Sequence, residues 1–320
     1  MGPVSATAYA WQLGECLLAI ALAPLFAGWV GQCRAWLQNR SAPPLWQPYR
    51  VLRKLFHKDA ALATHASWLF RLAPYAVFAT MVVAAAIVPS VTTELPLARV
   101  ADAIALVGVF ATGRVFMSLA AMDVGTAFGS MGARREMMIG FLTEPALLMV
   151  LFSAFLAFGS TALPRVVEVV LRQPHIMLHP SLFFAAVAFV MVLLAENARL
   201  PVDNPTTHLE LTMIHESMTL EYSGRHLALI EWAAWLKLFN YACIGFTLFM
   251  PWGIALHGAG PGLLALAIGA LAAKLAVAGA ALALLESVTA KLRLFRAPEF
   301  LTMAFLLAVL GLLVHLLLEV

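Results

Sequence analysis

The chain has 320 residues, of which 62% are hydrophobic and 12% are charged, and its formal net charge is +3. This composition excludes an ordinary soluble domain, whose charged fraction is about twice as large. The small positive charge comes from basic loops between apolar segments, so it gives no reason to expect a nucleic-acid partner. The sequence therefore predicts an integral membrane protein in contact with a lipid bilayer.

Apolar segments long enough to cross a bilayer recur along the whole chain. A spanning helix needs about 20 apolar residues. About eight segments qualify, of which the fifth is the shortest, and they lie at roughly 8–30, 69–90, 97–121, 139–161, 180–196, 231–252, 261–285 and 299–319. They are apolar on all faces and lack strand alternation, which favours helices. We expect an all-α polytopic membrane protein, with residues 1–320 forming one transmembrane domain.

Basic residues gather in every second loop between these segments. The odd-numbered loops hold fourteen Lys and Arg residues, whereas the even-numbered loops hold three. Basic loops remain on the cytoplasmic side of a membrane. Since an even number of spans places both chain ends on one side, we expect both termini in the periplasm of a bacterial inner membrane.

The first basic loop contains an amphipathic segment. Pro48 suits the first turn of a helix, and apolar residues at 51, 52, 55 and 56 form a stripe opposite Arg53 and Lys54. A helix of this kind lies along a membrane surface. The sequence thus predicts an amphipathic surface helix that anchors the cytoplasmic side.

The second basic loop is rich in glycine. Residues 123–136 include Gly125, Gly129 and Gly132, and they end close to Arg134 and Arg135. Glycine permits tight turns and close backbone approach, and the absence of a following Lys-Ser/Thr excludes a P-loop. We expect a packed loop that serves as a docking surface.

The third basic loop has the densest set of charges in the chain. Charges that directly follow a membrane span must be paired, hydrated or covered by another protein. Pro205 and Gly224 predict one helix between them, on which His208 and His215 lie nearly on one face. The two histidines would be about 10 Å apart, too far for one ion, so no metal site is expected.

Ionisable residues also occur within or at the ends of the predicted spans. They are Glu15, Arg114, Glu144, Glu196, Glu231, Lys237, Lys274 and Glu286. Glu15, Lys237 and Glu286 lie close to span ends, so they are expected to be members of structural ion pairs or interfacial groups. Glu144 and Glu196 belong to separate spans and are expected to open toward one hydrated cavity. There they form either a proton path or a structural ion-pair network.

The cysteines give no sign of a cofactor within this chain. Cys16, Cys33 and Cys243 form no CxxC pair, so they cannot hold an iron–sulfur cluster here and are expected to be small buried residues. The sequence also lacks a Ser-His-Asp arrangement, a haem-ligand pair and a nucleotide loop. We expect no catalytic residue, cofactor or metal in this chain itself.

Two motifs in the third basic loop carry a family resemblance. They read Ala195-Glu196-Asn197-Ala198-Arg199-Leu200-Pro201-Val202-Asp203 and Glu221-Tyr222-Ser223-Gly224. Both resemble the complex I subunit 1 family, the membrane subunit on which the peripheral arm docks. The intervening segment 207–216 is most similar to the formate hydrogenlyase and hydrogenase-4 members, the membrane subunits of group 4 nickel–iron hydrogenases. Thr206 and His208 stand where complex I usually has acids, which puts a quinone site in doubt.

The resemblance implies a membrane-anchoring, proton-coupling subunit of a formate-hydrogenlyase-like or hydrogenase-4-like complex, itself a non-catalytic part of an oxidoreductase. The implied partners are the hydrogenase large and small subunits, an iron–sulfur ferredoxin-like subunit and antiporter-like membrane subunits. Iron–sulfur clusters and a nickel–iron centre would then belong to these partners. The alternatives are a quinone-pocket subunit of a complex-I-type NADH:quinone oxidoreductase and a stand-alone secondary transporter.

The resemblance also implies roles for individual residues, with the surface helix forming the lip of a lateral opening. The implied proton path consists of Glu144, Glu196, Asp203, Glu210 and Glu221. The implied docking residues on the basic loops are Arg40, Arg53, Lys54, Arg134, Arg135, Arg199, Asp203 and Arg225.

Overall fold

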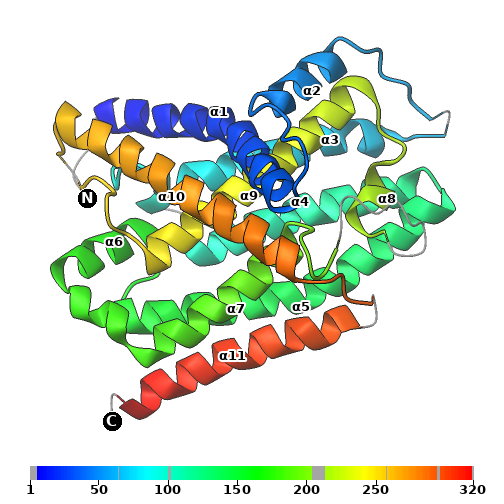
Figure 1. Ribbon diagram of the computed structural model, residues 1–320. Coiled ribbons are helices and arrows are strands. Elements are labelled where there is room, and N and C mark those ends of the chain that lie inside the picture. The colour runs from blue at the N-terminus through cyan, green and yellow to red at the C-terminus, as the bar shows by residue number, and fades with distance from the viewer. Residues whose placement is uncertain are drawn as a thin grey trace.

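Long apolar helices packed side by side build the protein (Figure 1). The computed structural model describes residues 6–63, 65–99, 102–203, 213–256, 258–293 and 296–318. Within them, seven helices are long and apolar enough to cross a membrane. They are α1 (Ala6–Leu37), α3 (Trp68–Ile87), α4 (Ala103–Asp123), α5 (Ala127–Phe158), α9 (Gly224–Phe249), α10 (Pro261–Val288) and α11 (Ala297–Leu318). The shorter apolar helix α7 (Pro180–Glu196) matches the fifth predicted segment. The prediction of an all-α polytopic membrane protein is confirmed.

The predicted amphipathic surface helix is also confirmed. It is α2 (Gln47–Phe56), with Pro48 in its first turn and Leu52 buried. The Tyr49 hydroxyl donates to the backbone carbonyl of Ala21 in α1, while Arg53 and Lys54 are exposed. The helix therefore lies with its apolar stripe on the bundle and its basic face outward.

The prediction of a glycine-rich loop at 123–136 is wrong. Helix α4 continues to Asp123 and α5 begins at Ala127, where the Thr126 side chain accepts from the amide of Gly129. Gly125 lies in the short turn between the two helices with φ +74°, whereas Gly132 serves helix packing: a Cβ there would lie 2.9 Å from the carbonyl oxygen of Ile214. Glycine permits both uses, and here it permits a close approach of α5 to the third basic loop.

The prediction of an unbroken helix from Pro205 to Gly224 is also wrong. In the described part of this loop, Met213 and Ile214 precede a short helix α8 (His215–Thr219), and turns follow before α9. Residues 204–212, which include His208 and Glu210, lie outside the described residues. The expectation that His208 and His215 share one face of an unbroken helix therefore loses its basis.

Two short helices follow α5 that the sequence analysis did not predict. Helix α6 (Leu163–Arg172) buries Leu163, Val166, Val167 and Val170, and the 3-10 turn η2 (Pro174–Leu178) follows it. A second 3-10 turn, η1 (Leu97–Arg99), precedes α4 where a span was predicted to begin. The apolar spacing of three and four residues in α6 was the available signal.

Small residues hold the helices together. Alanines are fully buried in several helices, for example Ala23, Ala84, Ala146 and Ala185. At Gly311 in α11, an added Cβ would lie 2.9 Å from the carbonyl oxygen of Ser181 in α7. Membrane helices associate through such close packing, because lipid offers no hydrophobic drive between them.

The bundle has two distinct ends. In Figure 1, α1 begins and α11 ends at the end that carries α6, and we call it the termini end. The opposite end, which we call the loop end, carries α8, the α4–α5 turn and the start of α9. At the termini end, the buried Glu15 accepts from the Ser90 hydroxyl (2.9 Å) and from the amides of Ser90 (3.1 Å) and Thr92 (2.6 Å). Glu15 is thus a buried anchor and not an interfacial group.

Candidate functional site

Arg114, in the middle of α4, binds three carboxylates inside the bundle. Its Nη1 lies 2.5 Å from Glu144 and its Nε lies 3.3 Å from Glu136, both on α5. Its Nη2 donates to Glu196, the last residue of α7. The guanidinium is suited to this position because it offers five donors and stays protonated. One side chain therefore joins three helices through charge.

Glu196 has further partners. Lys237 of α9 lies 2.8 Å from its Oε2, and the Thr143 hydroxyl donates to its Oε1 at 2.5 Å. The Glu196 side chain is 2% exposed, whereas that of Glu144 is 37% exposed. Lys237 therefore forms a structural ion pair, which is one of the two predicted alternatives, and is not an interfacial group.

A second branch leads from Glu136 toward the loop end. The Nε2 of His215 lies 3.0 Å from Glu136, and its Nδ1 lies 3.3 Å from Asp203. Asp203 in turn lies 3.2 Å from the Nζ of Lys291, in the segment after α10. Charged groups therefore follow one another without a gap from Lys291 at the loop end to Lys237 inside the bundle.

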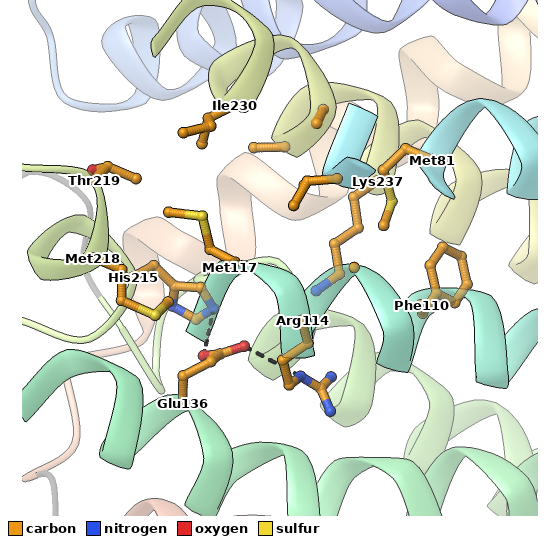
Figure 2. A pocket seen from close by; sticks show the side chains of 14 residues that line it. Met81, Phe110, Arg114, Met117, Glu136, His215, Met218, Thr219, Ile230 and Lys237 are labelled. Carbon is orange, nitrogen blue, oxygen red and sulfur yellow. Dashed lines mark ion pairs between the residues drawn. The ribbon is translucent and has the colours of Figure 1, made fainter. Parts of the chain in front are cut away.

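A cavity of about 140 Å³ lies beside this charge chain, between α3, α4, α5, α8 and α9. Most of its wall is apolar, and its polar lining consists of Arg114, Glu136, His215, Thr219 and Lys237. Figure 2 shows Arg114 and His215 reaching the Glu136 carboxylate from either side. A volume of this size holds several waters, and these polar groups offer the partners that buried water needs.

The predicted arrangement of Glu144 and Glu196 around one cavity needs correction. The described residues that line the cavity include neither of them. The carboxylate at the cavity is Glu136, and Arg114 stands between it and the other two. Glu144 and Glu196 share the Arg114 cation, and neither of them lines this cavity.

The environment of His215 shifts its proton affinity. Burial alone would lower the pKa of His215, but the nearby Glu136 carboxylate and the hydrogen bond with Asp203 outweigh burial, so the pKa lies above its ordinary value of 6.5. A folded-state pKa above the unfolded one means that protonation stabilises the folded state. This contribution is complete below pH 6.5 and is lost as the pH rises through the folded-state pKa.

We therefore expect α8 to be held less firmly at alkaline pH. Amide hydrogen exchange of residues 215–219, corrected for the intrinsic pH dependence, should show stronger protection at pH 6 than at pH 9. The variant His215→Gln should lose this pH dependence, whereas His175→Gln, at an exposed histidine of η2, should keep it. Equal protection at both pH values in the unaltered chain would contradict the expectation.

The Ala-Glu-x-x-Arg-x-Pro-x-Asp motif contacts the end of α10 and the segment after it. Arg199 lies 3.1 Å from Glu286 of α10, which also lies 3.6 Å from Arg34 of α1. The amide of Leu292 donates to the carbonyl of Pro201 at 2.8 Å. Glu286 is therefore a buried ion-pair partner, which is one of the two predicted alternatives, and is not an interfacial group.

The Glu-Tyr-Ser-Gly motif ties the third basic loop to the chain after α2. Tyr222 stacks on Phe70 with ring centroids 4.0 Å apart, and Ser223 makes hydrogen bonds with the amide and carbonyl of Ala61. Gly224 has φ +52°, and a Cβ there would lie 2.8 Å from the carbonyl oxygen of Lys58. Glu221 is exposed, so three of the four motif residues form the joint and the first one faces outward.

The residues assigned to partner docking divide into two groups. The exposed group consists of Arg40, Arg53, Lys54, Arg134 and Arg225. The other three have internal partners: Arg135 donates to the carbonyl of Met213 at 2.8 Å, Arg199 pairs with Glu286, and Asp203 is buried against His215. The charges of this second group are already satisfied within the chain.

Sequence reasoning did not assign Glu136, His215 or Lys291 to the site. Glu136 was placed at the end of a loop, and His215 was tested only as a metal ligand. The available signal was Arg114, because a cation inside an apolar span requires anionic partners. Cys16, Cys33 and Cys243 are buried free thiols, as predicted.

Comparison with known proteins identifies related sequences. The family model described as NADH dehydrogenase matches residues 13–317. Formate hydrogenlyase subunit 4 of Escherichia coli (strain K12) is 34% identical over 290 residues, which cover 90% of this chain and 92% of that protein. Hydrogenase-4 component C of the same strain is 33% identical over 245 residues, covering 77% of this chain and 76% of that protein.

A solved structure shares the fold. A chain of the membrane-bound sulfane sulfur reductase, an archaeal respiratory membrane complex, superposes with a TM-score of 0.82 at 18% identity. The match covers 97% of this chain and 99% of that one. The helical arrangement is therefore shared along nearly the whole length of both chains.

Proposed function

The chain belongs to the NADH dehydrogenase family, and from this we propose that it is the membrane-anchoring, proton-coupling subunit of a formate-hydrogenlyase-like or hydrogenase-4-like complex. Its two relatives from Escherichia coli are named as a subunit and a component of such enzymes. This likeness favours the proposal over a quinone-pocket subunit or a stand-alone transporter. The chain is a multi-pass membrane protein, and in this proposal catalysis belongs to the partner subunits.

The observation that carries the coupling role is the unbroken charge chain through Arg114. Its members lie 2.5–3.3 Å from their neighbours at five successive contacts, from Lys291 through Asp203, His215, Glu136 and Arg114 to Glu144. Placing so many ionisable groups within a membrane bundle is costly. A set of this kind transmits a change of charge at the loop end to the carboxylates within the bundle.

In this proposal, the soluble partner subunits bind the loop end and the membrane partner subunits bind the sides of the helices. The exposed basic residues at the loop end, including Arg53, Lys54, Arg134 and Arg225, would contact the hydrogenase large and small subunits and a ferredoxin-like iron–sulfur subunit. Antiporter-like membrane subunits would pack beside the helices. Iron–sulfur clusters and the nickel–iron centre would reside in these partners.

We further propose that the loop end faces the cytoplasm and both termini face the periplasm. The support is the excess of Lys and Arg in the odd-numbered loops. Reporter fusions after residue 210 and at the C-terminus should give cytoplasmic and periplasmic signals, respectively. A cytoplasmic C-terminus would overturn this orientation.

Glu144 offers the sharpest test of coupling. The variant Glu144→Gln keeps the shape of the side chain and removes its charge and titration. Because Glu144 is 37% exposed, assembly and hydrogen evolution should survive, while proton movement per turnover in sealed vesicles should fall at least about tenfold. The matched control is Glu168→Gln, which removes a carboxylate that pairs with exposed Arg165 on α6. Full proton movement in Glu144→Gln would mean that this carboxylate is structural.

Glu196 belongs to the family motif, but a substitution of Glu196 by glutamine is a poorer test of proton coupling than Glu144→Gln. It is buried and faces Arg114, Lys237 and the Thr143 hydroxyl. Replacing it with glutamine leaves two buried cations without an anion between them, which costs several kcal/mol. Loss of assembly in that variant would not separate a coupling role from a structural one.

A further inference from the structure

His215 has a carboxylate at each of its ring nitrogens. Nδ1 lies 3.3 Å from Oδ2 of Asp203 and donates to it when it carries the ring proton, and Nε2 lies 3.0 Å from Oε2 of Glu136. Both Nε2 and this Oε2 are buried, and neither has a hydrogen-bond partner among the residues that the structure describes. The two atoms are thus 3.0 Å apart, which is within proton-transfer distance.

His215 lies between the loop end and helix α5, so its two contacts lead from one to the other. Asp203 belongs to the loop end, where Lys291 also contacts it. Glu136 belongs to α5, where Arg114 contacts it. The imidazole is therefore the point at which the loop-end charges meet those inside the bundle.

The net charge of this set of contacting residues depends on the protonation state of His215. Its acids are Asp203, Glu136, Glu144 and Glu196, and its permanent cations are Arg114, Lys237 and Lys291. Among the residues that the structure describes, four acids and three cations give this set a charge of −1 when the imidazole is neutral and 0 when it is protonated. An imidazole is the group in this set that can exchange a proton near neutral pH.

We propose that His215 carries protons between Asp203 at the loop end and Glu136 at the cavity. This assignment rests on the proposed coupling function and names the residue through which a proton enters the bundle. The adjoining cavity, which both His215 and Glu136 line, supplies room for the water that completes the exchange.

The transfer uses the two ring nitrogens in turn. The neutral ring carries its proton on Nε2; a proton from the Asp203 side binds Nδ1 and forms the imidazolium. The Nε2 proton then passes to Oε2 of Glu136, and the ring becomes neutral with its proton on Nδ1. The ring is reset when it turns over or exchanges the Nδ1 proton for one on Nε2 through cavity water. No bond between heavy atoms changes, and the proton count balances.

Two substitutions separate proton carriage from a fixed ionic bridge. Arginine at this position keeps a cation between Asp203 and Glu136 but cannot release a proton. Glutamine keeps polar contacts and has no titratable group. The complex should be tested with His215→Arg, His215→Gln and the exposed-histidine control His175→Gln, by measuring hydrogen evolution and proton movement in sealed vesicles from pH 5.5 to 9.

We expect both His215 variants to lose proton movement per turnover at least about tenfold, while His175→Gln matches the unaltered complex. Wild-type proton movement should fall as the pH rises above the pKa of His215, and the residual movement in His215→Gln should not follow this profile. If His215→Arg moves protons normally, the residue is an ionic bridge and the proposal is overturned. If the arginine variant does not assemble, the glutamine variant decides: normal proton movement in it overturns the proposal.

The companion variant Glu144→Gln distinguishes this inference from the broader function. Loss of coupling in Glu144→Gln together with normal coupling in His215→Gln removes His215 from the path and leaves the coupling function standing. Normal coupling in both variants removes the coupling function as well.

Discussion

Replacing Arg114 with methionine is expected to destabilise the folded chain by about 3–5 kcal/mol. The substitution keeps an unbranched apolar side chain of similar length, but it leaves Glu136, Glu144 and Glu196 near one another without the cation that they share. Lys237 alone then faces the buried Glu196. Thermal unfolding of the purified chain in detergent should show a markedly lower midpoint, and the yield of folded protein in membranes should fall.

The control for Arg114→Met is Arg165→Met. Arg165 is exposed on α6 and pairs with Glu168 three residues later, so its loss should change stability by at most about 1 kcal/mol. The double variant Arg114→Met/Glu144→Gln should recover part of the loss, because it also removes the carboxylate that pairs with Arg114 and that the single variant leaves without this cation. Equal stability of the two single variants would refute the central role of Arg114.

Replacing Gly140 with alanine is expected to cost about 1–3 kcal/mol, although alanine normally favours a helix. An added Cβ would lie 2.8 Å from Cδ and 3.0 Å from Cζ of Arg114. The three carboxylates prevent the arginine from moving aside without lengthening its contacts. The loss should therefore appear in both the unfolding midpoint and proton movement.

Gly108, on the neighbouring helix α4, is the matched control. A Cβ there would meet nothing within 4 Å, so Gly108→Ala should be neutral or should stabilise the chain by up to about 1 kcal/mol. The two variants make the same chemical change and should shift stability in opposite directions. A shift of the same sign in both would mean that the close contact with Arg114 does not restrict position 140.

The spans and the surface helix were predictable because their signals are local. Apolar runs of sufficient length identified the membrane helices, and the spacing of Leu52 against Arg53 and Lys54 identified α2. The membrane charges Arg114, Glu144 and Glu196 were also visible as exceptions within apolar segments. Their proximity was predicted in general terms, but the identity of each pair was not.

The missing part of the site depends on contacts between distant segments. Glu136 and His215 lie 79 positions apart in the sequence, and their pairing follows from the docking of α8 on α5. The glycines at 129 and 132 show the same limit, because glycine suits both a tight turn and a close helix contact. Only the positions of neighbouring helices decide between these uses.

The unequal exposure of Glu144 and Glu196 has a consequence for neighbouring membrane proteins. Both carboxylates contact the same guanidinium, yet the Glu196 side chain is buried and the Glu144 side chain is partly exposed at the side of the bundle. In a medium of low dielectric constant, a charge brought against that flank acts strongly on Arg114 and, through it, on Glu136 and Glu196. A neighbouring membrane protein can therefore interact electrostatically with these residues in the plane of the membrane. This interaction does not require an ion to cross the bilayer at this point.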